Sequence, residues 1–180
     1  MTVTTIPLAG LPAIGTPFGG GLFGGAYLEY GTPMALIVPP KALGQSTIKL
    51  PFGAAGKIAG ARSLIDGLAN TRALGDASPA AKYCLDLRIG GLDDWHLPAL
   101  DQMSVQRANF TPEDDHIPEQ TTAEAFKLGG PEAFDIDDWY WTSTEWGSGY
   151  AWVQLFDYGG QTSDAKDWSC RVRAVRKCPL

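Results

Sequence analysis

The sequence lacks a long hydrophobic run and an excess of positive charge. No stretch of about eighteen consecutive apolar residues occurs, so we expect no segment that inserts into a membrane. Lys and Arg number 14 against 20 Asp and Glu, which gives a formal net charge of −6. That balance argues against binding to the phosphate backbone of a nucleic acid.

Histidine and cysteine are scarce, which limits the catalytic and metal sites that the chain can build. Neither His96 nor His116 has a partner spaced for catalysis, so we expect His96 to be a structural hydrogen-bonding residue. A disulfide from Cys84 to Cys170 or Cys178 would tie a middle helix to the last strand. Three reduced thiols, typical of a protein made in the cytoplasm, are the favoured alternative.

Cofactor-binding motifs are lacking as well. Residues 19–24 (GGGLFG) have the glycine spacing of a dinucleotide-binding loop, but a strand is expected where the helix should begin. Residues 53–57 do not form a phosphate loop, because Pro51 stands where the first glycine should be and Ile58 replaces the hydroxyl that would meet magnesium. We therefore expect no cofactor and no catalytic residues.

Acidic residues occur in short runs that lack the spacing of an EF-hand. Residues 135–138 (DIDD) begin like a calcium loop, but Tyr140 takes the sixth position and Trp146 the twelfth, where that loop needs glycine and glutamate. The pairs at 93–94 and 114–115 could ligate calcium from loops. Solvated acidic loops are the favoured interpretation, so we expect no metal site.

Glycine and proline are abundant, with 22 and 13 residues, and this favours turns, short strands and long loops over a helical bundle. Hydrophobic residues make up 44% of the chain and charged residues 19%, as in a folded globular protein. A chain of 180 residues is long enough to fold as one domain without a metal or a disulfide. We expect a short arm at residues 1–21 and the domain at residues 22–180.

The expected arm has neither a helical nor a strand period, yet it carries the apolar residues Ile6, Leu8, Leu11 and Ile14. As an extended arm it would bury them against a neighbouring subunit. Packing on its own domain and disorder are the alternatives, and the sequence does not decide between them. The first fifteen residues lack basic residues and a clear cleavage site, so we do not expect a signal peptide.

Local patterns predict a mixture of short strands and helices. A turn at residues 31–33 predicts a hairpin over residues 23–38. Ser78 followed by Pro79 predicts the start of a helix that ends at Gly90. The other expected elements are helices at 100–107 and 122–128, a weak helical or looped segment at 61–70, and strands at 47–50, 138–143, 151–156 and 170–176.

Aromatic residues are concentrated in residues 138–176. Five of the six tryptophans lie there, and the full set is Trp139, Trp141, Trp146, Trp152, Trp168, Tyr140, Tyr150, Tyr158 and Phe156. Such rings bury large areas and keep a polar edge, so this density predicts both a packed core and a surface that binds a partner. The basic side chains at the end of the stretch are expected to form a solvated or salt-bridged face. They are Arg171, Arg173, Arg176 and Lys177.

Four short motifs resemble those of one family. Residues 95–98 (WHLP) are similar to its D-W-R-L-P, with His96 in place of arginine, and residues 140–145 (YWTSTE) to its Y-W-S-S-T-E. Residues 151–156 (AWVQLF) are similar to A-W-x-x-x-F, and residues 172–176 (VRAVR) to V-R-C-V-R. This is the Lcl C-terminal-domain type, formerly a domain of unknown function, and the resemblance covers about residues 20–177.

The resemblance implies a C-type-lectin-like fold of the α+β class, in which two helices flank small twisted antiparallel sheets and long loops project from one face. It also implies a disulfide from the first helix, but Ala174 replaces the motif cysteine, so Cys170 or Cys178 would have to substitute. Formylglycine-generating enzymes share this fold and use a cysteine pair. A strand between Cys170 and Cys178 would not readily bring the two together, so we expect no enzyme.

Strand alternation and the resemblance together predict a binding surface. The resemblance places Trp152 and Phe156 in the packed set, so Val153 should point to an open face together with Leu155. Exposed Trp and Tyr in the adjoining turns are frequent binding anchors, although Trp146 and Trp168 could instead be core residues. The expected receptor-binding residues are Trp146, Tyr150, Val153, Leu155, Asp157, Tyr158, Asp164 and Trp168, whereas Trp95, Trp139 and Trp141 are assigned to the core.

The glycine-rich start, the hairpin and residues 35–41 (ALIVPPK) resemble family members encoded by tailed bacteriophages, which lie near the tail tip of the virion. Related members diversify the last third of the chain to change the receptor that they bind. The resemblance implies a non-enzymatic adhesin of the virion tail, made in the host cytoplasm, that recognises a glycan, a pilus or an outer-membrane protein. We expect contacts with other tail proteins and a homo-oligomer such as a trimer. The alternatives are a structural tail protein with its aromatic surface buried between subunits, a bacterial lectin-like adhesin, and a formylglycine-type enzyme.

Overall fold

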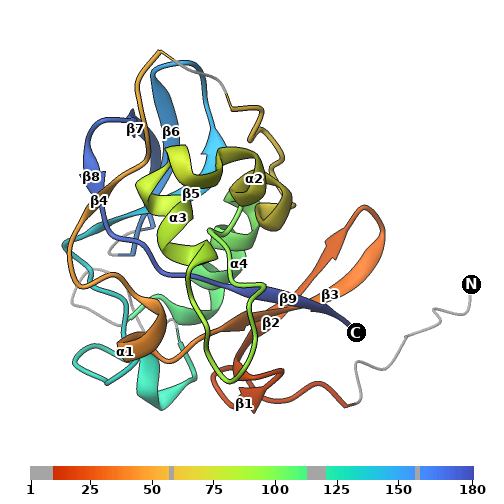
Figure 1. Cartoon of the computed structure of the whole chain (residues 1–180). Helices are drawn as coiled ribbons and strands as arrows, with labels where there is room; N and C mark the ends of the chain where they lie inside the picture. The colour runs from red at the N-terminus through yellow and green to blue at the C-terminus, as the bar shows by residue number, and fades with distance from the viewer. Residues whose placement is uncertain (1–9, 57–58, 113–120, 157–158) are drawn as a thin grey trace, which may run out of the picture.

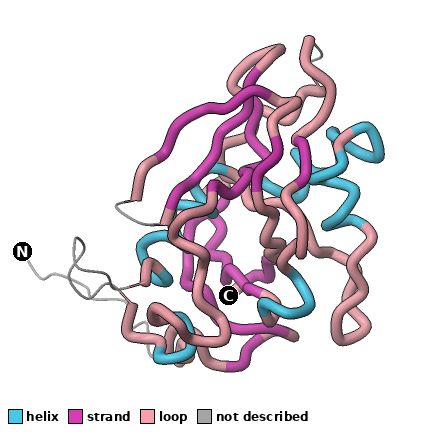
Figure 2. The backbone as a smooth tube through the Cα atoms, turned by 90° about the vertical axis from the view of Figure 1, so that its left-hand side faces the viewer, coloured by secondary structure: helices cyan, strands magenta, loops and turns pink. Residues whose placement is uncertain are grey.

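The chain folds into a mixed α and β structure in which short helices lie beside small antiparallel sheets (Figure 1). The computed structural model describes residues 10–56, 59–112, 121–156 and 159–180. The strands form the middle of the molecule, and the helices lie outside them (Figure 2). In the described part of the chain, none of the helices has the length and apolarity that a bilayer crossing requires.

The first sheet joins the beginning of the domain to its end. Its strands are β1 (Pro17–Phe18), β2 (Gly21–Glu29), β3 (Thr32–Val38) and β9 (Arg176–Pro179), in the order β1-β2-β3-β9. The hairpin predicted over residues 23–38 is confirmed, because β2 and β3 pair antiparallel with Leu28 opposite Pro33. A turn with positive φ at Tyr30 and Gly31 connects them, and Gly31 adopts that conformation without steric cost.

Two further sheets complete the strand layer. The three-stranded sheet has the order β5-β6-β7 and contains β5 (Trp139–Glu145), β6 (Tyr150–Leu155) and β7 (Gln161–Ala165). The two-stranded sheet pairs β4 (Leu50–Pro51) with β8 (Ser169–Cys170). In the described chain, β6 is the middle strand of its sheet and therefore has neighbours on both edges.

The helices are short, and two of them begin where the sequence predicts. The Ser78 hydroxyl accepts a hydrogen bond from the Ala81 N–H, and Pro79 occupies the first turn of its helix. The Gln102 side chain accepts from the Ala99 N–H at the start of the longest helix. The described helices are α1 (Lys41–Gly44), α2 (Gly67–Leu74), η1 (Gly75–Ala77), α3 (Pro79–Leu85), α4 (Leu100–Phe110) and η2 (Glu124–Phe126).

The expected strand at residues 170–176 is wrong as a single element. The chain forms β8, then makes isolated one-residue pairings, then forms β9. Arg171 pairs with Tyr140, Arg173 with Gln45, and Val175 with His96. Since each partner belongs to a different part of the chain, the segment crosses the molecule without joining one sheet. The expected strand at 47–50 is displaced to β4, and the segment at 61–70 overlaps only the first half of α2.

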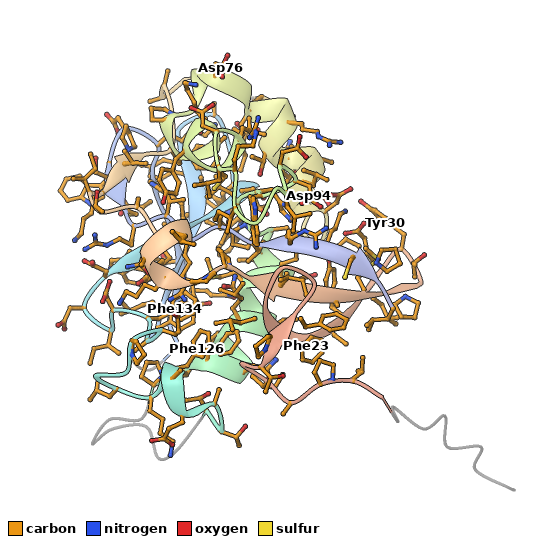
Figure 3. The ribbon with its side chains drawn as sticks, turned by 60° about the horizontal axis from the view of Figure 1, so that its bottom comes forward. Phe23, Tyr30, Asp76, Asp94, Phe126 and Phe134 are labelled. Carbon is orange, nitrogen blue, oxygen red and sulfur yellow. The ribbon has the colours of Figure 1, made fainter. Side chains whose placement is uncertain are left out.

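Buried side chains form two clusters. The first contains Trp95 and Trp141, which confirms their assignment to the core, and half-buried Trp139 packs against it. The second contains Phe126 and Phe134, which lie close together in Figure 3. Its rings stack in pairs. The ring centroids of Phe110 and Phe126 lie 3.8 Å apart, and those of Phe134 and Phe156 lie 3.9 Å apart. The aromatic density of the sequence is therefore partly a core feature.

The described part of the expected arm packs on its own domain. Leu11 contacts the first core cluster, and Ile14 contacts both clusters. Residues 17–18 form β1, which pairs with β2. For residues 10–21 these contacts favour packing on the chain's own domain over an extended arm or disorder. Ile6 and Leu8 lie outside the described residues.

Candidate functional site

Three aromatic side chains are exposed at one end of the β5-β6-β7 sheet. Trp146 lies in the β5–β6 turn, Tyr150 begins β6, and Trp168 lies in the turn between β7 and β8. Their exposed fractions are 57%, 48% and 63%. Trp146 and Tyr150 meet edge to face, with centroids 6.0 Å apart and planes at 82°. We call these three residues the ring surface.

Backbone hydrogen bonds fix the turns that carry the ring surface. The Trp146 N–H donates to the Tyr150 carbonyl at 3.1 Å, which closes the β5–β6 turn. The Lys166 N–H donates to the Gly149 carbonyl at 2.9 Å, so the β7–β8 turn lies against the β5–β6 turn. Both turns therefore belong to the same end of the sheet, at the top of Figure 1.

Two residues expected in the binding surface are buried. Val153 has no exposed surface and Leu155 is 8% exposed, so the prediction that they face outward is wrong. Val153 belongs to the first core cluster, as does Ala151 on the same face of β6. Trp152, expected to be packed, is only half-buried. Phe156 is fully buried in the second core cluster, which confirms that it belongs to the packed set. Both faces of β6 are therefore covered by the rest of the chain, and Trp152 is the partly exposed member.

The remaining expected site residues are placed as follows. Asp164 is half-buried, and its carboxylate accepts a hydrogen bond from the Ala165 N–H at 2.8 Å. Asp157 and Tyr158 lie outside the described residues. The structure thus brings Trp146, Tyr150, Trp168 and Asp164 to one end of the sheet.

A pocket that no pattern in the sequence predicts lies beside the ring surface. Its volume is about 330 Å³. It lies between the loop after β4, the helices α2 and η1, the end of β5 and the β7–β8 turn. Its lining residues are Phe52, Gly53, Ala54, Ala59, Ala73, Leu74, Ala77, Ser78, Glu145 and Lys166.

A buried ion pair lies at one side of the pocket. Lys166 Nζ lies 2.6 Å from Glu145 Oε1, and the two side chains are 2% and 1% exposed. The Glu145 carboxylate also accepts hydrogen bonds from the backbone N–H groups of residues 59–61, at 3.0 to 3.1 Å. Lys166 Nζ lies 5.7 Å from the centroid of the Phe52 ring. A buried carboxylate needs such compensation, and here it also fixes the loop that forms one wall of the pocket.

The pocket and the ring surface share their supporting segments. The Gly56 N–H donates to the Ser148 carbonyl at 2.9 Å, and the Gly53 N–H donates to the Lys166 carbonyl at 3.0 Å. The loop after β4 is therefore held against both turns of the ring surface. Glu145 lines the pocket, and its neighbour Trp146 belongs to the ring surface. We treat the pocket and the ring surface as one candidate binding site.

The basic residues near the C-terminus are all ion-paired, which confirms the expected salt-bridged face. Arg171 pairs with Asp138 at 2.6 Å and Arg176 with Asp94 at 2.8 Å. Lys177 pairs with Glu29 and with Asp66. Arg173 departs from the expectation of a solvated face. It is fully buried, with Cζ 4.5 Å from the centroid of Phe134, and pairs with Glu132 at 3.0 Å.

The acidic run at residues 135–138 is engaged in ion pairs. Burial alone would raise the pKa of Asp138, but hydrogen bonds from Lys49 and Arg171 hold it below its ordinary value. The pKa of Asp135 is also lowered. Burial acts to raise it, but the hydrogen bond that Lys41 donates to its carboxylate at 2.8 Å lowers it. No group of three or more His, Cys, Asp or Glu residues is placed to hold a metal ion within the described ranges.

Three of the residues considered for catalysis, His96, Cys84 and Cys170, are buried. His96 is fully buried, and its Nδ1–H donates to the Asp94 carbonyl at 3.0 Å. The structure describes Cys84, Cys170 and Cys178 as free thiols. Burial raises the pKa of Cys170 to about 12, which disfavours the thiolate that acts as a nucleophile. His116 lies outside the described residues.

Comparison of the chain with models of protein families and with curated proteins gives no match in either set.

Proposed function

We propose that the protein is a non-enzymatic receptor-binding protein of a bacteriophage virion, with a C-type-lectin-like fold, located at the tail tip. The four motifs of the sequence support this reading of the fold. All four include residues buried in the core, at Trp95, Trp141, Phe156 and Val172. Small antiparallel sheets, flanking helices and long loops are the arrangement that such a fold requires.

The ring surface is the observation that carries the proposal. Tryptophan and tyrosine are the side chains that most often anchor partners in interfaces. The structure buries Trp95 and Trp141 in the core but leaves Trp146 and Trp168 more than half exposed. Since burial of a Trp side chain stabilises a fold by a few kcal/mol, their exposure at one end indicates a surface kept for a partner.

Binding to host cells tests the proposal. Labelled protein is incubated with a panel of candidate bacterial hosts, and cell-bound fluorescence is measured for the wild type, Trp146→Ala and Trp168→Ala. We expect each substitution to weaken binding about tenfold or more, the effect of losing an anchor worth at least 1.4 kcal/mol. Leu43→Ala is the control, because Leu43 is 54% exposed on α1 and belongs neither to the ring surface nor to the pocket. Equal binding by all four proteins would contradict the proposed site.

A second role, assembly with copies of itself or with other tail proteins, is favoured by a separate surface. Leu28, Tyr30 and Leu180 are 64%, 75% and 46% exposed. Leu28 lies opposite Pro33 across the hairpin, and the Leu180 N–H donates to the Pro33 carbonyl at 3.1 Å. We call Leu28, Tyr30, Pro33 and Leu180 the hairpin end. In this proposal the hairpin end joins neighbours and leaves the ring surface for the receptor.

A further inference from the structure

We infer that the pocket beside the ring surface binds an uncharged aromatic side chain of a protein receptor. The inference rests on the proposed function of receptor binding, and it narrows the receptor from any cell-surface molecule to a protein. Three properties of the pocket carry it: its apolar walls and size, the internal pairing of its polar groups, and its preformed loop.

The walls of the pocket suit a flat apolar group. Phe52 and Leu74 provide the largest apolar side chains, and four alanines and a glycine line the rest. A cavity of about 150 Å³ lined by apolar residues is enough to bind benzene. The pocket measures about 330 Å³, so a phenyl or indole group fits inside it. Burial of such a group is favourable by about 25 cal/mol of free energy for each Å² of apolar surface removed from water.

The polar side chains of the pocket already have partners within the chain. The Ser78 hydroxyl donates to the Phe52 carbonyl and accepts from the Ala81 N–H. Glu145 accepts from three backbone N–H groups and from Lys166. A sugar entering the pocket would lose hydrogen bonds to water without gaining equivalent ones from these side chains. A charged group would find no net opposite charge, because the Glu145–Lys166 pair is neutral as a whole.

The pocket is also preformed, which favours the tight seating of one rigid group. The carboxylate of Glu145 fixes residues 59–61, and hydrogen bonds from Gly53 and Gly56 hold the loop after β4. Binding therefore requires little ordering of the chain, which is the main cost that preorganisation removes. A pocket for one bulky anchor, flanked by exposed Trp and Tyr, is a common arrangement at the centre of protein–protein interfaces.

The pocket is tested first with a small probe. Indole is titrated into the ¹⁵N-labelled full-length protein, and N-acetylglucosamine into a parallel sample, while amide chemical shifts are followed. We expect saturable shifts with indole, centred on residues 52–54 and 73–78, and none with the sugar. The variant Ala73→Trp places an indole inside the pocket from an exposed position of α2 and should weaken indole binding about tenfold or more.

The matched control is Ala69→Trp, which adds the same side chain one turn earlier on α2, at an exposed position that does not line the pocket. It should bind indole like the wild type, and thermal melts check that both variants fold. Saturable binding of the sugar without indole, or equal indole binding by both variants, would overturn the inference.

Cell binding then separates this inference from the proposed function. Host cells are treated either with protease, which removes surface protein, or with periodate, which oxidises glycans. We expect protease to abolish binding and periodate to leave it, and Ala73→Trp to lose binding that Ala69→Trp keeps. Binding that needs Trp146 but tolerates Ala73→Trp would refute the pocket inference and leave the proposed function standing. Indole binding in the pocket of a protein that binds none of the host cells would refute the proposed function and leave the preference of the pocket for an aromatic group standing.

Discussion

The side chain of His96 is held neutral by its surroundings. Burial is the largest cause, and it lowers the pKa of His96 to about 4, against the hydrogen bond to the Asp94 carbonyl, which acts in the opposite direction. Nearby charges act as well, with Lys177 lowering the pKa and Asp66 and Asp94 raising it. The ring therefore takes up a proton much less readily in the folded chain than in the unfolded chain, whose histidine pKa is about 6.5.

This difference predicts a loss of stability in mild acid. Between pH 6.5 and 4 the unfolded chain binds a proton at His96 and the folded chain does not, so the contribution is complete above pH 6.5 and is lost as the pH falls toward 4. The full span corresponds to about 3 kcal/mol. Urea unfolding at pH 7.0, 5.5 and 4.5 measures it, and His96→Gln should show a flatter dependence. A wild-type stability that stays constant over this range would contradict the prediction.

Sequence reasoning identified single residues well where a motif or a ring type marked them, and poorly where burial depends on the whole fold. Trp95 and Trp141 were predicted in the core, and Trp146 at an exposed site. The prediction that Val153 and Leu155 face outward is wrong, because alternation separates the two faces of a strand without showing that the rest of the chain covers both of them. Within the pocket, Glu145 closes one of the motifs, but no pattern links it to Lys166, 21 positions later.

At the scale of elements, Ser78 joins a helix to a neighbouring strand. Its hydroxyl caps α3 through the Ala81 N–H at 3.1 Å and also donates to the Phe52 carbonyl, next to β4. Ser78→Ala removes both hydrogen bonds at a buried position, so we expect the free energy of unfolding to fall by about 2 kcal/mol. Urea unfolding followed by circular dichroism provides the measurement.

The control for this cap is Ser104→Ala on α4. The Ser104 hydroxyl donates to the Leu100 carbonyl of its own helix and accepts from the Gln161 side chain at an exposed site. It caps no helix and its bond to Gln161 is replaceable by water, so we expect a loss below about 0.5 kcal/mol. If both substitutions changed stability equally, the link between α3 and β4 would not be the source of the effect.

The elements that the sequence predicted are those governed by local chemistry. The β2–β3 hairpin follows from its glycine-containing turn, and α3 from a hydroxyl cap followed by proline. The segment after β8 could not be predicted in the same way. Arg171, Arg173 and Val175 each pair with a residue from a distant part of the chain, so no local period describes their conformation. The pocket was missed for the same reason, since its walls come from four separate segments.

The whole molecule is held together where distant segments meet at buried charges. The Arg173 guanidinium lies between Phe126 and Phe134, with Cζ 5.5 Å and 4.5 Å from the ring centroids, and donates to Glu132. The second ion pair, Lys166 with Glu145, joins the β7–β8 turn to the end of β5. Lys166, Glu145 and Arg173 are nearly inaccessible to solvent and Glu132 is 17% exposed, so each pair is a contact that only the complete fold can satisfy. These ion pairs hold the long loops in place, because the loops have little local conformational preference of their own.

The molecule presents two different exposed apolar regions, the ring surface and the hairpin end. Figure 1 shows them apart, with the β5–β6 turn at the top and the β2–β3 hairpin extending from the side. The hairpin end also brings the last strand beside the first hairpin, since β9 pairs with β3. An exposed apolar region at the free end of a sheet suits contact with another copy of the chain, because it adds apolar area without disturbing the core.

We therefore predict that the protein forms an oligomer through the hairpin end. Light scattering should give a particle mass that is a multiple of the chain mass, and Leu28→Asp should shift it toward the single chain, since a carboxylate buried in an apolar contact costs several kcal/mol. Leu43→Asp is the matched control, because Leu43 is 54% exposed on α1, away from the hairpin end. Trp146→Ala should leave the mass unchanged if the ring surface is free in the assembly. A wild type that scatters as a single chain would contradict the predicted oligomer. A mass that falls in Trp146→Ala and not in Leu28→Asp would place the contact at the ring surface instead of the hairpin end.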